Sequence, residues 1–451
     1  MSLLETYAAL PYVAHAYPQS DPARFGVVGH LAGLSPKLPS KARILEIGCA
    51  VGGNLAPLAA RYPNAECMGI DLSPEQVDAA VIRDSKATYS ARDLCTLAST
   101  DGPFDYVIAH GVYSWVPSAV RDVLFQRIRE VLAPTGLAYV SYNVLPGWYG
   151  RLAIRDVMLA RTASVSGPLE KVRAARQILA LLANNATEGP HRDALREEAA
   201  RIRNEPDAWL FHDYLEVFNT PVTYRHVVEH ARRDGLATLG DAALHTSQLR
   251  SLDETADSLL KQWSDDAVTY ETYLDTLRNR TFRQTVFAHA NSPLSSDVGP
   301  GHLHGLHLRT QLLSDGEGRF TDGTRSIAAQ DPSMTTLLDH LGSAHPGSAE
   351  FTPDQPDDIA ARAFFGISTG AITASLEPVA AVRPSRAPRL WQGAMDMAKR
   401  GETALTNLAH ETVELPEDVL QVARRLDGRK KPRPGWSKAL GVLAAHAFLD
   451  A

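Results

Sequence analysis

The stretch LEIGCAVGGNL, residues 45–55, decides the fold of this chain. A short apolar segment runs into a glycine-rich turn, and a segment with helical periodicity begins near Asn54. Glycines let the backbone turn tightly after a strand and let a ligand come close to the main chain. The N-terminus of the helix that follows points its free N–H groups at such a ligand. Strand, glycine loop and helix in this order therefore predict a cofactor site at one end of a parallel sheet.

The alternation of strands and helices continues as far as residue 145. Strands are predicted at residues 43–47, 66–70, 88–91, 104–109 and 137–142, and helices at residues 54–60, 74–85 and 118–132. This alternation predicts βαβ units in a doubly wound α/β sheet, and continuous apolar runs such as YVIA fit a sheet covered on both faces. The alternation stops after Trp148, where long helical patterns take over.

The sequence after residue 150 contains one stretch that is typical of a domain boundary. NSPLSSDVGPG at 291–301 is typical of a boundary, RLWQGAMDMAKRGETALTNL at 389–408 predicts a helix, and HETVEL at 410–415 predicts a strand. We expect four parts, namely a cofactor domain at 1–150, a helical connector at 151–204, a mainly helical domain at 205–300 and an α+β domain at 301–451.

The residues around the glycine loop favour one class of cofactor. NAD, FAD and S-adenosylmethionine (SAM) enzymes all use such a loop, and a tight structural turn without a ligand is the alternative. Ala50 stands where a middle glycine would let a pyrophosphate approach, and Glu46 suits a cationic ligand better than a phosphate. SAM has a sulfonium and no pyrophosphate, so it is the favoured cofactor.

Two acids follow the next strands in the order that a nucleoside requires. Asp71 comes 19 residues after Gly52, a spacing at which an acid accepts hydrogen bonds from ribose hydroxyls, while Ser73 is the predicted cap of the helix at Pro74. Asp93 is expected to accept a hydrogen bond from the adenine amino group, with Leu94 as an apolar wall.

Aromatic and polar residues follow the fourth and fifth strands. Ligands of open α/β sheets bind beyond the carboxyl ends of the strands, so this crevice should contain His110, Tyr113, Trp115, Tyr142, Asn143 and Trp148. The two tryptophans could equally well pack between domains, because large aromatic side chains dominate interfaces and cores alike.

Four motifs together resemble one family: LEIGCAVGGNLAPLA, GIDLSPEQV, FDYVIAHGVYSWVP and AYVSYNVLPGWYG. They are similar to bacterial class I SAM-dependent methyltransferases with a methyltransferase regulatory domain, among them the rickettsial-type protein-lysine methyltransferases of outer-membrane proteins. The resemblance implies a Rossmann-like doubly wound sheet, a mainly helical regulatory domain at 205–300 and a winged-helix-like α+β domain at 301–451. It also implies that the N-terminal segment, with Tyr7, Tyr12 and Tyr17, folds near the cofactor.

The resemblance implies the cofactor contacts, and the crevice beyond the fourth and fifth strands supplies the candidates around the methyl acceptor. SAM contacts are expected from Glu46, Gly48, Gly52, Asn54, Asp71, Asp93, Leu94 and His110, with Cys49, Gly53 and Leu72 in the same loops. Tyr113, Tyr142 and Asn143 are the expected catalytic residues around the methyl acceptor, and Trp115, Trp148 and Tyr12 are the expected substrate-binding residues.

Bulk composition excludes several classes of protein. The chain has 451 residues and a formal net charge of −7, without the basic excess typical of nucleic-acid binding. No apolar run is long enough to span a membrane, and the first residues lack the features of a secretory signal, so we expect a cytoplasmic protein. The three cysteines form no CxxC pair, and His302, His304 and His307 lack acidic or thiolate partners nearby, so we expect no metal site.

The sequence therefore predicts a SAM-dependent methyltransferase whose acceptor is most simply a lysine of a protein or peptide, because so large a non-catalytic portion suits a macromolecular substrate. One alternative is a small-molecule or peptide natural-product N- or O-methyltransferase. An alternative of another class is a SAM-binding scaffold without activity. A homodimer is compatible with every one of these readings.

Overall fold

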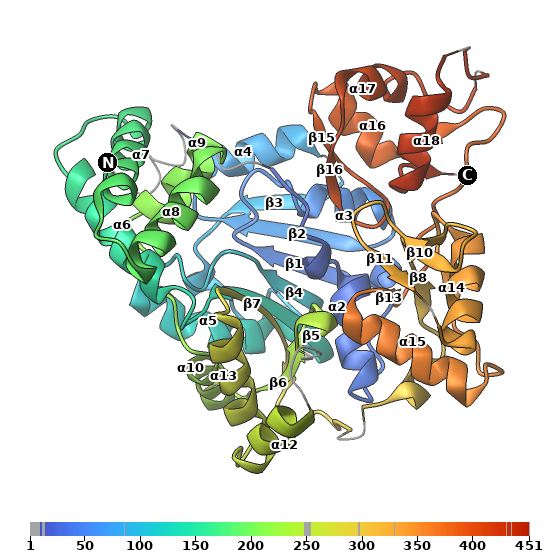
Figure 1. Cartoon of the computed structure of the whole chain (residues 1–451), viewed down its shortest axis with the longest axis horizontal. Coiled ribbons are helices and arrows are strands. Elements are labelled where there is room, and N and C mark those ends of the chain that lie inside the picture. The colour runs from blue at the N-terminus through green and yellow to red at the C-terminus, as the bar shows by residue number, and fades with distance from the viewer. Residues whose placement is uncertain are drawn as a thin grey trace.

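The computed structural model describes residues 10, 14–84, 86–247, 254–295, 298–328, 330–429, 431–433 and 435–450. Its centre is a seven-stranded sheet in the order β3-β2-β1-β4-β5-β7-β6 (Figure 1). The strands are β1 (Arg43–Ile47), β2 (Glu66–Asp71), β3 (Thr88–Ala91), β4 (Phe104–Ala109), β5 (Leu132–Asn143), β6 (Leu236–Asp241) and β7 (Phe282–His289).

The predicted doubly wound sheet is confirmed. β1 pairs in parallel with both β2 and β4, so the chain winds outward to one edge and then returns to build the other. The carboxyl ends of β1 and β4 therefore flank the point where strand order reverses, which is where such sheets bind ligands. The bounds of β1, β3 and β4 are those predicted, while β2 extends to Asp71 and β5 begins five residues earlier, at Leu132.

The last two strands come from a region that we expected to form a separate, mainly helical domain. β7 runs antiparallel to β5, from Ala138 opposite Phe287 to Asn143 opposite Phe282, and β6 pairs antiparallel with β7. β7 is buried along most of its length because it lies between two neighbours. A boundary at residue 150 would therefore cut through this sheet, because its last two strands lie between Leu236 and His289.

Helices cover both faces of the sheet. One face packs against α2 (Pro22–Leu31) and α3 (Leu55–Arg61) through an apolar cluster that includes Phe25 and Leu58. The other face packs against α5 (Ser118–Val131) and α10 (Tyr224–Arg233) through a cluster that includes Phe125 and Val227. The remaining helices of this part are α4 (Pro74–Arg83), α11 (Leu244–Ser247), α12 (Glu254–Gln262) and α13 (Ala267–Arg278), and η3 is a 3₁₀ turn (Leu94–Thr96).

A helical insert separates β5 from α10. It has its own apolar cluster, centred on Met158, Leu179 and Phe211, and it forms the green lobe of Figure 1. Its elements are α6 (Tyr149–Thr162), α7 (Pro168–Asn185), α8 (Pro190–Arg203), α9 (Asp207–Leu210) and the π-helical turn η4 (Phe211–Leu215).

The chain after residue 300 forms two further apolar clusters, and the first of them extends onto α2 through Val27 and Leu31. That first part contains β8 (His307–Arg309), β9 (Leu313–Ser314), β10 (Arg319–Thr321), β11 (Ser326–Ala328), α14 (Pro332–Ala344), β12 (Ala349–Glu350), α15 (Asp357–Thr369) and β13 (Thr373–Ser375). The second contains β14 (Arg389–Leu390), α16 (Gln392–Lys399), β15 (Ala404–Thr406), β16 (Thr412–Glu414), α17 (Glu417–Ala423), α18 (Ser437–Ala445) and β17 (Leu449–Asp450).

The predicted helix at 389–408 is shorter in the structure. It ends at Lys399, because Gly401 adopts a positive φ of 88° and turns the chain into β15. β15 pairs with β16, so the HETVEL segment does contain the expected strand. Within the described ranges, no helix combines the length and the apolar character that a membrane crossing would need.

Candidate active site

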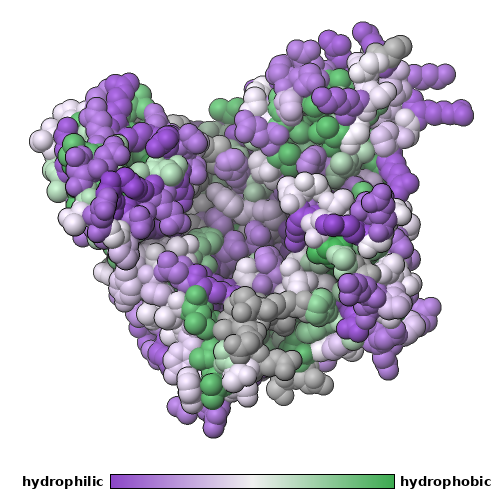
Figure 2. All heavy atoms as spheres, in the orientation of Figure 1, coloured by the Kyte–Doolittle hydropathy of each residue, from purple (hydrophilic) through white to green (hydrophobic). Residues whose placement is uncertain are grey.

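A cavity of about 760 Å³ lies beyond the carboxyl ends of the central strands. Figure 2 shows the molecular surface hollowed between the helical insert and the C-terminal region. The predicted residues that line the cavity are Glu46, Gly48, Cys49, Gly53, Asn54, Asp71, Leu72, Asp93, Leu94, His110, Trp115, Asn143 and Trp148. Gly52 stands behind them and closes the loop, since its N–H donates to the Cys49 carbonyl at 2.9 Å.

The loop after β1 keeps its backbone open toward the cavity. Gly48 has φ +73°, and a Cβ there would come within 2.8 Å of the Val112 side chain. Ala50 also adopts a left-handed conformation, with φ 47°, which is unfavourable for a residue other than glycine. Its N–H donates to Asp71 Oδ2 at 2.9 Å, so a hydrogen bond to the end of β2 holds the loop in this form.

Glu46 is buried at the floor of the cavity, and its two carboxylate oxygens differ. Oε1 accepts a hydrogen bond from Asn54 Nδ2 at 2.7 Å, whereas Oε2 is buried without a hydrogen-bond partner in the part of the chain that is described. Burial raises the pKa of Glu46 to about 8; the Asn54 hydrogen bond opposes this shift and the charge of Asp71 adds to it. An orphaned carboxylate oxygen in this position fits a cationic ligand such as SAM.

Asp71 and Ser73 share the end of β2 as the sequence predicts. Ser73 caps α4 by accepting from the Gln76 N–H at 3.3 Å, and Asp71 accepts from the N–H groups of Ala50 and Ser73. Burial raises the pKa of Asp71. Asp93 caps η3 by accepting from the Cys95 N–H at 2.9 Å. The ribose role of Asp71 and the adenine role of Asp93 remain our proposals.

His110 forms an aromatic wall with a residue from the N-terminal segment. Tyr17 stacks on it with ring centroids 3.7 Å apart, and His110 Nδ1 lies 2.9 Å from the Tyr139 hydroxyl. Burial lowers the pKa of His110 to about 3, so the ring is neutral near pH 7. Tyr17 thus lies at the cavity, as the resemblance implied, whereas Tyr7 and Tyr12 lie outside the described residues.

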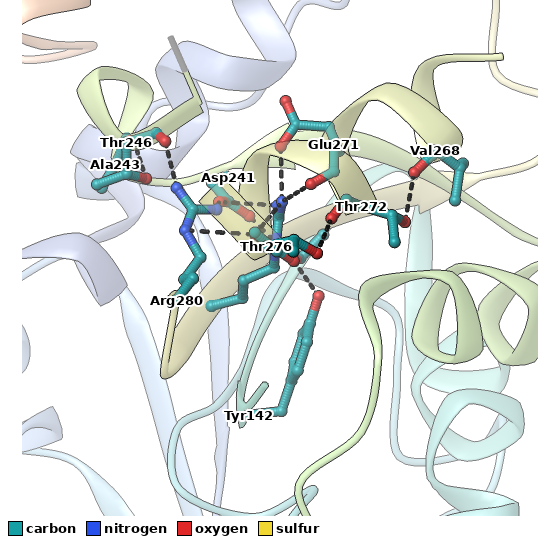
Figure 3. Close-up of polar contacts among 12 residues, drawn as sticks. Tyr142, Asp241, Ala243, Thr246, Val268, Glu271, Thr272, Thr276 and Arg280 are labelled. Atoms are coloured by element: carbon teal, nitrogen blue, oxygen red, sulfur yellow. Dashed lines mark hydrogen bonds and ion pairs between the residues drawn. The ribbon is translucent and has the colours of Figure 1, made fainter. Parts of the chain in front are cut away.

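Tyr113 and Tyr142, both predicted to be catalytic, do not line the cavity. Their side chains are buried in the core under α5 and α10. The Tyr113 hydroxyl is 2.9 Å from His230 Nδ1, and the Tyr142 hydroxyl is 2.8 Å from Thr285 Oγ1. Figure 3 shows Tyr142 pointing toward the ion pairs around Asp241. Tyr142 lies on β5, where side chains alternate between the two faces of the sheet, and its side chain is on the face that packs against α5 and α10.

Asn143 and Trp148 mark the part of the cavity away from the cofactor loops. Asn143 Nδ2 donates to Asn219 Oδ1 at 3.0 Å, and Trp148 Nε1 donates to the Thr281 carbonyl at 2.8 Å. Both side chains are therefore fixed by segments that follow the helical insert. Trp148 is almost fully buried and serves in packing as well as in lining the cavity.

The structure adds residues that the sequence reasoning did not place in the site. They line the cavity beside Asn143 and Trp148, and they are Arg151, His212, Asp213, Phe218, Phe282 and Gln284. Asp213 belongs to η4, and burial raises its pKa to about 7. In the sequence, the only indication of this part of the site is an acid among aromatic residues in HDYLEVFN, residues 212–219. No local pattern connects this segment to the glycine loop.

The charges of the cavity are mostly acidic. Arg92 is paired with Asp101 at 2.6 Å, and Arg151 lies 3.6 Å from Glu198, so the two arginines on the described wall already have partners. Across the described ranges, no group of three or more His, Cys, Asp or Glu side chains comes together as a metal site. The cavity therefore offers carboxylates to a cationic, largely apolar ligand.

Two family models match the chain. The first, described as a methyltransferase domain, covers residues 44–136, and the second, described as a predicted methyltransferase regulatory domain, covers residues 206–289. The first match runs from β1 into β5, and the second runs from α9 to the end of β7.

Relatives and a solved structure agree with the family models. An uncharacterized protein of Rickettsia prowazekii is 34% identical over 236 residues, which are 51% of this chain and 94% of the relative. A second one is 33% identical over 318 residues, 68% of this chain but only 57% of that longer relative. The structure of PKMT2 from Rickettsia typhi matches with a TM-score of 0.86 and 23% identity over 98% of this chain and 100% of that one, and the same fold is also known in complex with AdoHcy. The chain belongs to the bacterial class I SAM-dependent methyltransferases that carry a methyltransferase regulatory domain.

Proposed function

We propose that this protein transfers the methyl group of SAM to the side-chain amine of a lysine in a protein or peptide. The proposal rests on the position of Asp213, which lines the cavity. Of the acids on the described cavity wall, Asp213 comes from η4, whereas Glu46 and Asp71 lie at the carboxyl ends of β1 and β2 and Asp93 follows β3. It is thus the acid available to a second ligand when the cofactor occupies the glycine loop.

The surroundings of Asp213 suit a lysine. Trp148, Phe218 and Phe282 line the same part of the cavity and offer apolar surface to the four methylenes of the side chain. Aromatic faces also attract a cationic amine, and burial raises the pKa of Asp213 to about 7 even though the charges of Arg201 and Arg151 act in the opposite direction. Because Arg92 and Arg151 are already paired, an anionic small molecule would meet uncompensated negative charge here.

SAM supplies an electrophilic methyl group on a sulfonium. A new N–C bond forms as the S–C bond breaks, and the amine must present its lone pair in line with that bond. At a reference pKa of about 10.4, roughly one lysine in two thousand is neutral at pH 7. The aromatic wall favours the neutral amine by excluding water, and Asp213 accepts an N–H hydrogen bond that turns the lone pair away from itself. A carboxylate of pKa about 7 is also suited to take up the departing proton.

The architecture outside the sheet supports a macromolecular substrate. The helical insert and the C-terminal region flank the hollow above the site, and they provide surface that a small metabolite would not need (Figure 2). Membership of a family in which one solved relative is named PKMT2 agrees with this choice.

The experiment uses the purified chain with methyl-tritiated SAM and a bacterial lysate, separated into protein and small extractable fractions. Label in protein bands that mass spectrometry locates on lysine supports the proposal. Label confined to small molecules overturns it in favour of a natural-product or metabolite methyltransferase, and absence of any transfer despite SAM binding favours a scaffold. The Asp213→Asn variant should lose transfer, and Asp156→Asn, at an exposed acid of α6, is the matched control.

A further inference from the structure

We propose that the hairpin of β15 and β16, which lies in the C-terminal region and is distant in sequence from the glycine loop, is part of the cofactor site. In this view His410 is a positioning residue, which sets the orientation of Asn54 and, through Asn54, that of Glu46. The proposal concerns SAM binding and does not rest on the identity of the methyl acceptor.

The turn of this hairpin is built to hold His410 in one place. Asn407 Oδ1 accepts from the N–H groups of Ala409 and Glu411, at 2.8 and 2.9 Å, and Asn407 Nδ2 donates to the His446 carbonyl at 2.8 Å. His410 itself adopts φ 58°, in the left-handed region that residues other than glycine rarely enter. Such a conformation persists only where the surroundings enforce it, and it often accompanies a functional constraint.

The side chain of His410 reaches across the domain boundary into the cofactor loop. It is 1% exposed, and its Nε2 lies 2.9 Å from Asn54 Oδ1, although the two residues are 356 positions apart in sequence. Burial lowers the pKa of His410 to about 4, so the ring is neutral near pH 7 and carries a single N–H. Because the amide oxygen can only accept, that N–H belongs to Nε2.

The orientation of the Asn54 amide follows from its four partners. Its oxygen accepts from the Tyr17 N–H at 2.9 Å and from His410 Nε2. Ser20 Oγ lies 3.0 Å from the same oxygen and 2.8 Å from the Tyr17 carbonyl, and its one proton can serve either acceptor. The Asn54 NH₂ group therefore donates to Glu46 Oε1 at 2.7 Å. If the amide were flipped, its oxygen would face the Glu46 oxygen instead. In this way one oxygen of Glu46 is fixed, and the unpartnered Oε2 is left for the ligand.

The hairpin is tied to the N-terminal segment at two further points. Glu411 lies 2.8 Å from Arg24 and 3.3 Å from Arg309. Burial alone would raise the pKa of Glu411, but the two arginines lower it to about 2. Thr412 Oγ1 accepts from the Ala16 N–H at 2.9 Å. The same segment carries Tyr17, which stacks on His110. The hairpin thus supports both the acid at the floor of the cavity and its aromatic wall.

Titration calorimetry with SAM and with AdoHcy tests the proposal on three variants. His410→Ala removes the donor, His410→Gln keeps an N–H donor at a similar reach, and His340→Ala is the control at an exposed histidine of α14. We expect the alanine variant to bind SAM about five- to tenfold more weakly, the value of one lost buried hydrogen bond. The glutamine variant should recover most of that loss, and the control should bind as the parent protein does. Equal affinity of the alanine and parent proteins overturns the proposal.

Hydrogen exchange on the unmodified protein gives a second test, which remains valid even if a variant fails to fold. Coupling between two sites is reciprocal, so a ligand that needs the hairpin must also stabilise its docking. We expect AdoHcy to slow amide exchange across residues 404–412, and His410→Ala to abolish that protection. Exchange at 404–412 that is the same with and without AdoHcy refutes the inference and leaves the methyltransferase assignment untouched.

Discussion

The affinity for SAM should rise steeply with pH, because Glu46 must become ionised to receive a cation. In the free protein the pKa of this buried carboxyl is about 8, so most molecules carry a neutral Glu46 at pH 6. A bound ammonium or sulfonium beside the orphaned Oε2 favours the carboxylate, which means that binding at acidic pH releases a proton. Each pH unit below about 8 then costs a factor of about ten, and between pH 8 and pH 6 the affinity should fall about 50-fold.

The measurement is titration calorimetry at pH 6, 7 and 8, repeated in buffers of different ionisation enthalpy to count released protons. The amino group of the ligand titrates in the same range, with a reference pKa of about 7.7–8.0, so Glu46→Gln supplies the baseline. This variant keeps the hydrogen bond from Asn54 but cannot ionise. The ratio of parent to variant affinity isolates Glu46. A ratio that stays constant from pH 6 to pH 8, with no proton release attributable to Glu46, would refute the reasoning.

Three further changes separate the roles of individual residues. Asp213→Asn should lower kcat/KM for a lysine peptide by about 10- to 100-fold while the SAM Kd stays within about twofold, and the parent rate should fall as pH drops through about 7, because Asp213 then becomes protonated. Asp71→Ala should weaken SAM binding in calorimetry by at least about tenfold, since the Ala50 N–H in the glycine loop loses its acceptor and the proposed ribose acceptor is lost as well. Tyr142→Phe should cost about 1 kcal/mol in denaturant unfolding through loss of the bond to Thr285, with turnover nearly unchanged.

The first five strands could be predicted because their signal is local. Most of them lie in short apolar runs bounded by turns, and β1, β3 and β4 have the predicted bounds. The last two strands could not be placed, since β7 finds its partners in β5 and β6 only after the helical insert has been bridged. Periodicity shows that a segment can be a strand, but not which sheet it joins.

The cofactor loops were predictable for the same reason, and the substrate side was not. Strand order alone brings Glu46 and Asp71 to one edge of the sheet. The side on which Tyr113 and Tyr142 lie depends on register and on what packs against each face, neither of which their motifs encode. Asp213 lines the cavity and His410 contacts Asn54 from segments that share no local pattern with the glycine loop. Their contribution is a property of tertiary packing.

The raised pKa values of Glu46, Asp71 and Asp213 have one origin, which also explains how the site could work. Burial raises the pKa of each carboxyl, and at Asp213 it outweighs the opposing charges of Arg201 and Arg151. A methyl transfer from a sulfonium to a lysine brings two cationic groups into the same space, where they would repel one another. Acids placed on both sides of the cavity offset that repulsion, and each ligand restores the ionised state of the acid beside it. We infer that this balance, set in part by segments outside the glycine loop, makes the cavity selective for a cationic acceptor.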